Sequence, residues 1–260
     1  MNKKKPLVSI IMNCHNGEQY LRESILSVIN QKYKNWELIF FDNNSKDQSV
    51  KIAKSFFNKK IRVFKSRKFL KLYEARNNAL KYAKGKYVSF LDTDDLWSPA
   101  KLKIQVQYLL KKKIKFVFSN FYYLKKKKRF INKKIVSFKE GYVCQDLLNN
   151  YGIGILTVLL SKEFFNTKLF NKKYDIIGDF DYFINLSLDN YFGYIDRPLA
   201  QYRIHDQNLS KKKFSTWIKE LESWINKNET SYNRKGIYLN SQKKYLKRLK
   251  MKKFIKKFLK

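Results

Sequence analysis

Three carboxylates lie within the segment FLDTDDLW at 90–97, in a chain of 260 residues with a formal net charge of +36. Asp92 and Asp94 are separated by one residue and directly follow an apolar run. Hard divalent cations such as Mg²⁺ and Mn²⁺ take several oxygen ligands and keep positions open for water and phosphate. Two aspartates at this spacing therefore suit a bridge between a metal ion and a diphosphate. The structural alternative is that Asp95 or Ser98 caps the helix that follows.

Other polar residues also follow the ends of predicted strands. Asn13 comes after the apolar run at 7–12, and Asp42 comes after the run at 36–41. In open parallel sheets, ligands bind outside the carboxyl ends of the strands. We therefore expect Asn13, Asp42 and Asp92 to gather at one edge of the sheet, where a ligand binds.

The elements that must position these residues alternate through the first 120 residues. Asn16 is the expected N-cap of the first helix, and Gly85 is expected to end the helix at 73–84 in a left-handed conformation. Short connections between strands and helices predict an α/β fold with a doubly wound, mostly parallel sheet. The predicted strands are 7–12, 36–41, 61–64, 87–91 and 116–118.

The pattern is weaker in the rest of the chain. A solvated loop or hairpin end is expected at 125–129, which reads KKKKR, and the other expected elements are a strand at 152–160, a helix at 179–189 and a strand at 191–195. From residue 211 the chain becomes strongly basic, with apolar residues at roughly helical spacing among the lysines. This tail is either a solvated, lysine-biased helix or a helix that lies on an anionic membrane.

Composition limits the class of protein. Lys and Arg number 57 against 21 acidic residues, which attracts polyanions, although a general bias toward Lys, Asn, Ile, Tyr and Phe explains the same excess. Two distant cysteines, Cys14 and Cys144, predict neither a zinc site nor a disulfide and fit a reducing cytosol. We expect no signal peptide. The longest uncharged stretch, 147–161, is too short and polar to span a bilayer.

Several segments resemble family 2 glycosyltransferases of the GT-A fold. They occur in the family's order and cover roughly the first 210 residues. The resemblance implies a GT-A domain over 1–210, with a nucleotide-sugar-binding half at 1–120 and a smaller acceptor-side half at 121–210. A basic helical C-terminal extension at 211–260 follows. The matching segments are VSIIMNCHNGEQYLRESILSVINQKYKNWELIFFDNNSKDQS at 8–49, ARNNALKYAKGKYVSFLDTDDLW at 75–97, and IIGDFDYFINLS with IDRPLAQYRIHDQNLS within 176–210.

The resemblance also implies roles for single residues. Asp179 matches the general base of inverting members, and Arg76 is expected to approach the diphosphate. The expected metal site, for Mn²⁺ or Mg²⁺, consists of Asp94, Asp92 and His205. His15 and Asn43 stand where the family commonly has a Tyr and an acid. The residues expected to bind the nucleotide-sugar are Asn13, His15, Asn16, Asp42, Asn43, Arg76, Asp92 and Thr93.

Each of these roles has a structural alternative. Asp179 and Asp181 could simply be acids that stabilise the N-terminus of a helix through the helix dipole. Asp181 is interpreted as a structural residue. His205 could be a hydrogen-bonded loop histidine, and Arg76 could be a surface charge on a helix.

The implied function is inverting transfer of a sugar from a nucleotide-sugar, expected to be UDP-linked, to a hydroxyl of a glycan or polyprenyl-linked acceptor. The expected context is assembly of cell-surface polysaccharide or lipopolysaccharide, in the cytoplasm or peripherally on the inner face of the membrane. Such transfer requires a base for the acceptor hydroxyl and positive charge for the departing diphosphate. Two other functions stay open. Nucleic-acid binding fits the charge but lacks an RRM, KH or zinc-finger signature, so we expect no specific nucleic acid partner. A sugar nucleotidyltransferase would also use metal-binding acids, but no Gly-rich loop follows the first strand.

Overall fold

The computed structural model describes residues 5–258, with the backbone alone at 256–258. The predicted units at 1–210 and 211–260 include residues 1–4 and 259–260, which lie outside the described residues. The described chain forms one nine-stranded mixed sheet. Its strands are Val8–Cys14 (β1), Trp36–Asp42 (β2), Ile61–Lys65 (β3), Tyr87–Phe90 (β4), Leu96–Trp97 (β5), Phe116–Lys125 (β6), Lys128–Ile131 (β7), Leu159–Ser161 (β8) and Gly193–Ile204 (β9).

The sheet has a parallel half and a mixed half. Its order is β3-β2-β1-β4-β8-β6-β9-β5, with β7 paired to β6. β3, β2, β1 and β4 are all parallel, whereas β8 is antiparallel to both β4 and β6. The predicted α/β fold with a mostly parallel sheet is confirmed. The carboxyl ends of β1, β2 and β4 lie at one edge, because parallel strands end on the same side.

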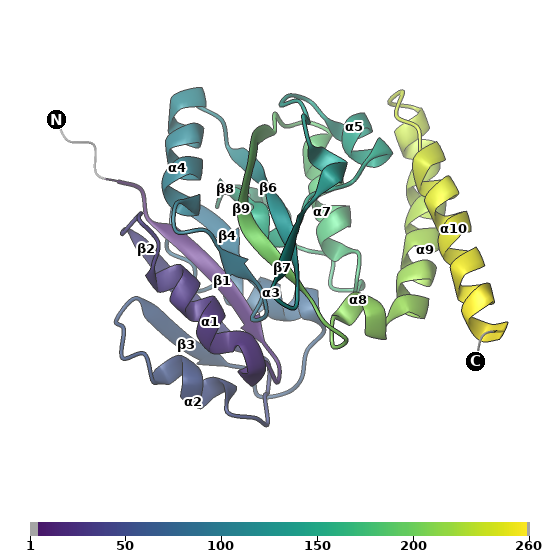
Figure 1. Cartoon of the computed structure of the whole chain (residues 1–260). Helices are drawn as coiled ribbons and strands as arrows, with labels where there is room; N and C mark the ends of the chain where they lie inside the picture. Colours follow the sequence, from purple (N-terminus) through teal and green to yellow (C-terminus); the bar gives the residue numbers. More distant parts are fainter. Residues whose placement is uncertain (1–4, 259–260) are drawn as a thin grey trace.

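Helices cover both faces of this sheet (Figure 1). Alternate residues of β1 point to opposite faces, so Ile10 packs in the cluster with α1 and α4, whereas Ile11 packs in the cluster with α3 and α7. The helices are Glu18–Ile29 (α1), Ser49–Lys54 (α2), Leu72–Leu80 (α3), Lys101–Lys112 (α4), Cys144–Asn149 (α5), Phe164–Thr167 (α6), Gly178–Ser187 (α7), Leu209–Lys212 (α8), Phe214–Asn233 (α9) and Asn240–Phe258 (α10), with 3₁₀ turns at Lys133–Ile135 (η1) and Ile155–Thr157 (η2).

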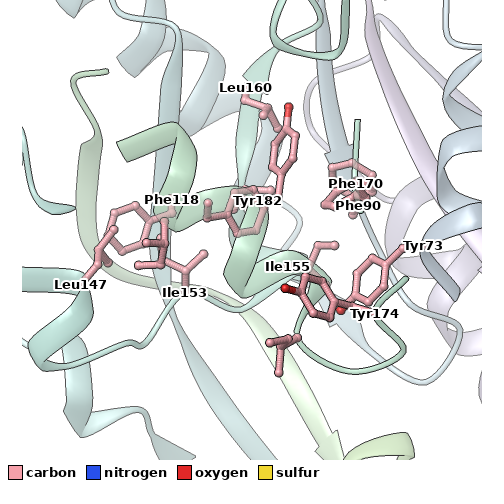
Figure 2. Close-up of a cluster of buried hydrophobic side chains, with 14 of the residues drawn as sticks. Tyr73, Phe90, Phe118, Leu147, Ile153, Ile155, Leu160, Phe170, Tyr174 and Tyr182 are labelled. Carbon is pink, nitrogen blue, oxygen red and sulfur yellow. The ribbon is translucent and has the colours of Figure 1, made fainter. Parts of the chain in front are cut away.

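An aromatic cluster holds α3 and α7 together beneath the sheet (Figure 2). The Phe170 ring lies 4.6 Å from the Tyr182 ring and 5.6 Å from the Tyr73 ring, measured between centroids. Tyr73 and Tyr182 are almost fully buried. Burying each such side chain stabilises the fold by roughly 1.5–3 kcal/mol. The packing therefore fixes the start of α7, which carries Asp179, against Tyr73 of α3.

Two expectations for single residues are wrong. Asn16 does not cap α1, because it has a φ of 52° and the residue before the helix is Gly17. A Cβ at Gly17 would lie 2.7 Å from Thr93 Oγ1, so a glycine is needed for this close approach. Gly85 is not left-handed, and α3 ends earlier, at Leu80. Gly85 is instead required because a Cβ would lie 2.6 Å from the backbone nitrogen of Ser9.

The second half of the chain departs further from the expected elements. The strand expected at 152–160 contains the η2 turn at 155–157, and only β8 at its end is extended. The strands expected at 116–118 and 191–195 are the beginnings of the longer β6 and β9, which pair in parallel from Val117 to Lys125. The predicted hairpin end at 125–129 is confirmed between β6 and β7. Pairing between distant strands extends β6 and β9 past the apolar runs that mark their starts.

The basic tail folds as two helices that lie side by side, at the end of the molecule away from β3 (Figure 1). Trp224 of α9 is fully buried in the same core cluster as α7, and Leu249 of α10 is buried there as well. The predicted boundary at residue 210 falls inside α8, and the division into 1–210 and 211–260 stays a prediction. Within the described chain, no helix is long and apolar enough to cross a membrane.

Candidate active site

The loop after β4 carries the aspartate cluster and is held by two distant elements. Ser24 Oγ of α1 lies 2.7 Å from the carbonyl oxygens of both Thr93 and Asp95. Asp95 is almost fully buried, and its Oδ1 accepts the backbone N–H of Arg203 at 2.9 Å. Burial raises the pKa of the Asp95 carboxyl, and Asp94 and Asp92 raise it further. Asp95 therefore joins the loop to β9, and no side chain caps α4.

Asp94 faces the end of β9. Its Oδ2 lies 2.8 Å from His205 Nε2, and the Asn208 amide lies 3.5 Å from the same oxygen. Burial raises the pKa of Asp94, and Asp92 adds to this, while His205 opposes it. His205 Nδ1 is buried and has no hydrogen-bond partner among residues 5–258. The two members of this pair are 111 residues apart in the chain.

Asp92 pairs with Arg76 of α3. Arg76 Nη2 lies 2.7 Å and 3.0 Å from the two carboxylate oxygens. The Arg76 side chain is 3% exposed, whereas that of Asp92 is 34% exposed. The guanidinium also lies 5.3 Å from the centroid of the Tyr73 ring. Arg76 is therefore a buried cation beside the aspartate cluster, and the alternative of a surface charge is wrong.

Asp179 lies at the N-terminus of α7, within reach of the charge of Arg76. Its Oδ1 lies 3.0 Å from the Tyr73 hydroxyl and accepts the backbone N–H of Phe180 at 2.9 Å. Burial raises the pKa of Asp179, whereas the charge of Arg76 and these two hydrogen bonds oppose the rise. A Cβ at Gly178 would lie 2.5 Å from the Tyr73 ring, so this glycine allows the close contact that orients Asp179.

Asp181 has a different environment although it is only two residues away. Its Oδ1 accepts Trp224 Nε1–H at 2.9 Å and the Asn185 amide at 3.0 Å. The residue is 9% exposed. These contacts connect α7 to α9, which supports the interpretation of Asp181 as a structural residue.

Asp42 and Asn43, which are expected to contact the nucleotide, hold the backbone of two loops at this edge. Asp42 is fully buried, and its carboxylate accepts the backbone N–H of Ser45 at 3.2 Å. The Asn43 side chain accepts the Leu70 N–H and donates to the Leu70 carbonyl, both at 2.9 Å. An aspartate at position 43 could not donate to that carbonyl. Asn43 therefore fits this contact better than the acid that is common in the family.

The residues after β1 form the exposed part of this edge. His15 Nδ1 lies 2.9 Å from the Asn43 carbonyl, and its ring centroid lies 4.6 Å from that of Phe69. Asn16 Oδ1 accepts the Lys46 N–H at 2.8 Å. The Asn13 amide atoms are buried without a hydrogen-bond partner in the part of the chain that is described. His15 and the half-exposed Phe69 present two aromatic rings at the carboxyl ends of β1 and β2.

Sequence reasoning missed several residues that shape this site. Arg203 donates from Nε to the Asp94 carbonyl at 2.9 Å, and Asn208 Nδ2 donates to the Arg203 carbonyl at 3.1 Å. Both lie in the quoted segment YRIHDQNLS, so their position beside His205 was an available signal. Tyr73 and Phe69 had no such signal, because only the folding of α3 and its preceding loop brings them to the site.

Asp179 also lines a cavity of about 610 Å³ on the side of the molecule that carries α9 and α10. Phe180 of α7 and Tyr202 of β9 form part of its wall. The cavity thus meets the group formed by Arg76, Asp92 and Asp179 at Asp179. Such an arrangement can place two substrates against one reacting centre.

Comparisons with known proteins point to one family and one fold. The chain matches the family model described as "Glycosyl transferase family 2" over residues 9–179. It is 35% identical over 212 residues to UDP-Glc:alpha-D-GlcNAc-diphosphoundecaprenol beta-1,3-glucosyltransferase WfgD of Escherichia coli, over 80% of this chain and 81% of that protein.

Two solved structures show the fold. S. aureus TarS 1-349 in complex with UDP matches with a TM-score of 0.66 and 17% identity, over 84% of this chain. The mannosyltransferase PcManGT from Pyrobaculum calidifontis, in complex with GDP-Man and Mn²⁺, matches with a TM-score of 0.64 and 13% identity, over 86% of this chain. The chain spans 65% of the length of each structure. At these identities the likeness shows the GT-A fold alone.

Proposed function

Because the chain belongs to glycosyl transferase family 2, we propose that it is an inverting, metal-assisted hexosyltransferase that uses a UDP-sugar. The proposed acceptor is a hydroxyl of a lipid-linked glycan in the assembly of cell-surface polysaccharide. The observation that carries this proposal is the position of Arg76, which forms an ion pair with Asp92 and whose charge opposes the raised pKa of Asp179. The family match favours glycosyl transfer over nucleic-acid binding and nucleotidyl transfer.

The donor would lie along the carboxyl ends of β1, β2 and β4. The exposed rings of His15 and Phe69 offer a surface on which the base can stack. The diphosphate would then reach Arg76 and the loop of Asp92 and Asp94. A UDP donor is supported by the WfgD relative, whose name gives UDP-Glc.

The residues present fit a divalent cation. Asp94 Oδ2 and His205 Nε2 are 2.8 Å apart, and two neighbouring donors on an octahedral cation with bonds of ~2.1 Å are about 3 Å apart. Among the described residues, no three His, Cys, Asp or Glu side chains gather closely enough to enclose a metal. The other positions would come from water and diphosphate, which suits Mg²⁺ or Mn²⁺. When bound, such an ion would supply positive charge to the departing diphosphate.

Asp179 would act as the general base. Its carboxylate takes the proton of the acceptor hydroxyl while the acceptor oxygen bonds to the anomeric carbon. The bond from that carbon to the diphosphate oxygen breaks, and UDP leaves with the electron pair. Tyr73 holds the carboxylate in place, and the cation of Arg76 favours its ionised form.

The first test is nucleotide binding, measured by thermal shift with UDP, GDP, TDP or CMP, each with and without Mn²⁺. UDP with Mn²⁺ at 100 times its Kd is expected to raise the Tm of the protein by about 5–10 °C. Asp94→Ala should lose the metal-dependent part of this shift. Asp206→Ala is the matched control, because this fully exposed acid lies beside His205 and outside the pair. An equal metal-dependent shift in Asp94→Ala, or no shift of the wild type with any of these nucleotides, would contradict the proposed donor site.

We also propose that α10 attaches the enzyme to an anionic membrane, where a lipid-linked acceptor resides. Met251, Phe254 and Ile255 are 59%, 63% and 50% exposed, and their spacing places them on one face of the helix. Leu249 points the other way and is buried. Lysines beside an anionic surface each add about 1 kcal/mol of attraction.

Vesicle cosedimentation tests this attachment. Met251→Glu with Ile255→Glu is expected to reduce the fraction bound to phosphatidylglycerol vesicles by about tenfold, because it removes buried apolar area and adds negative charge. Leu26→Glu, at a 41% exposed leucine of α1, should leave binding unchanged. Equal binding to neutral phosphatidylcholine vesicles, or unchanged binding of the double variant, would contradict the attachment.

A further inference from the structure

The cavity beside Asp179 is closed on one side by the basic C-terminal helix. Its wall includes Asp179 of α7, Trp217 of α9 and five residues of α10, among them Lys244, Tyr245 and Arg248. α10 lies along α9 at this end of the molecule (Figure 1). The basic tail therefore contributes side chains to a volume of about 610 Å³, which is large enough for a sugar with attached phosphates.

The cavity contains cations without acidic partners. Of the basic residues of α10, Lys243 pairs with Glu229 and Lys250 pairs with Glu222, so these two bind α9. In contrast, no acidic side chain among the described residues pairs with Lys244 or Arg248.

Lys244 and Arg248 are four residues apart on one face of the helix, where like charges repel. Lys134 of η1 lines the same cavity and also has no acidic partner in the described part of the chain. Three unpaired cations in one cavity form a site suited to phosphate groups.

The wall also offers contacts for a sugar ring. Trp217 and Tyr245 have ring centroids 6.2 Å apart, and Tyr245 is 38% exposed. Tyr151 is packed edge-on against Phe180, with centroids 5.0 Å apart. Aromatic walls with a few polar groups are typical of pockets that bind small ligands.

Two buried polar atoms of the wall lack a partner. They are the Tyr151 hydroxyl and Gln242 Oε1, neither of which has a hydrogen-bond partner among residues 5–258. Gln242 is only 5% exposed, and its amide nitrogen already donates to the Leu148 carbonyl. Unpaired buried polar atoms cost stability, so their presence in the wall is consistent with a polar ligand.

We propose that this cavity binds the acceptor, and that the acceptor is a sugar that carries a diphosphate. Its phosphates would contact Lys244 and Arg248, while its hydroxyl points to Asp179. This inference rests on the proposed function, because Asp179 is taken as the base. It assigns to α10 a role in acceptor recognition, in addition to the proposed membrane attachment.

Equilibrium binding to the full-length protein tests the site directly. The probe is octyl N-acetylglucosaminyl diphosphate, measured by isothermal titration calorimetry with UDP and Mn²⁺ at saturating concentrations to fill the donor site. Octyl N-acetylglucosaminide, which has no phosphate, is the reference ligand. Lys244→Ala with Arg248→Ala is expected to raise the Kd of the diphosphate probe by about tenfold or more. The Kd of the phosphate-free probe should not change.

The control variant is Lys247→Ala with Lys252→Ala. It removes the same charge from exposed positions of α10 that do not line the cavity, so it should bind the diphosphate probe as the wild type does. Equal weakening in both double variants, or no preference of the wild type for the diphosphate probe, would overturn the inference.

The outcomes separate this inference from the proposed function. Metal-dependent UDP binding without binding of the diphosphate probe would overturn the acceptor site and leave the donor site intact. Selective binding of the probe that depends on Lys244 and Arg248, without sugar transfer to it from any UDP-sugar, would support the site and contradict the proposed reaction.

Discussion

Asp179→Asn is expected to lower kcat by about 10²–10⁴-fold, the range that a general base contributes. Asparagine keeps the shape of the side chain and can still accept the hydrogen bonds of Tyr73 and the Phe180 N–H. It cannot take a proton from the acceptor. The rate of UDP release in the presence of acceptor measures kcat, and isothermal titration calorimetry of UDP should show an unchanged Kd.

Asp181→Asn is the matched control for this variant. Its amide can still accept Trp224 Nε1–H, and the residue lies outside the reacting group, so kcat should stay within about threefold of the wild type. If Asp179→Asn also kept its kcat within that range, Asp179 would not be the base.

The pKa of Asp179 gives this prediction a pH signature. Because burial raises that pKa above its ordinary value, the carboxylate is protonated over a wider acidic range, and kcat/KM should rise with pH through the raised pKa. Tyr73→Phe removes a hydrogen bond that lowers this pKa, so the acidic limb should move to higher pH.

Stability should change with pH in the opposite direction. Between the unfolded and the raised folded pKa, the folded state binds more protons, so stability falls as pH rises. Above the folded pKa the full cost of ionising Asp179 is present. Asp179→Asn should therefore raise the Tm slightly at neutral pH.

Arg76→Met is expected to lower both stability and activity. The substitution leaves Asp92 without its partner and removes the cation that opposes the raised pKa of Asp179. Breaking a fully buried ion pair costs ~3–5 kcal/mol, and the exposure of Asp92 to water reduces the expected loss to about 2 kcal/mol. We also expect kcat/KM to fall at least about tenfold and its acidic limb to move to higher pH.

Arg62→Met is the control that separates a loss of stability from a loss of activity. Arg62 forms an ion pair with Glu37 at 2.8 Å, between β3 and β2 and outside the candidate site. This control should lose stability, measured by urea unfolding, while its kcat/KM and pH profile stay those of the wild type. Identical pH profiles for Arg76→Met and the wild type would contradict the coupling between Arg76 and Asp179.

Part of this structure is determined by local sequence alone. The runs at 7–12, 36–41, 61–64 and 87–91 correspond to β1, β2, β3 and β4, because a short apolar run between turn residues is a local signal for a buried strand. Short connections between strands and helices predict that these strands are parallel, so the sequence also predicts that Asn13, Asp42 and Asp92 lie at one edge of the sheet.

The tertiary structure decided which side chains meet at that edge and which only support it. The pairing of Asp94 with His205, the burial of Arg76 and the contact of Tyr73 with Asp179 all join residues far apart in the chain. Asp94 and Asp95 are neighbours in sequence, yet one faces His205 and the other holds the backbone of β9. No periodicity distinguishes them, because the difference depends on where β9 returns to the sheet. The basic tail is a second example. Its apolar residues at helical spacing predict a helix, but only the packing of α10 against α9 places Lys244 and Arg248 beside the cavity of Asp179.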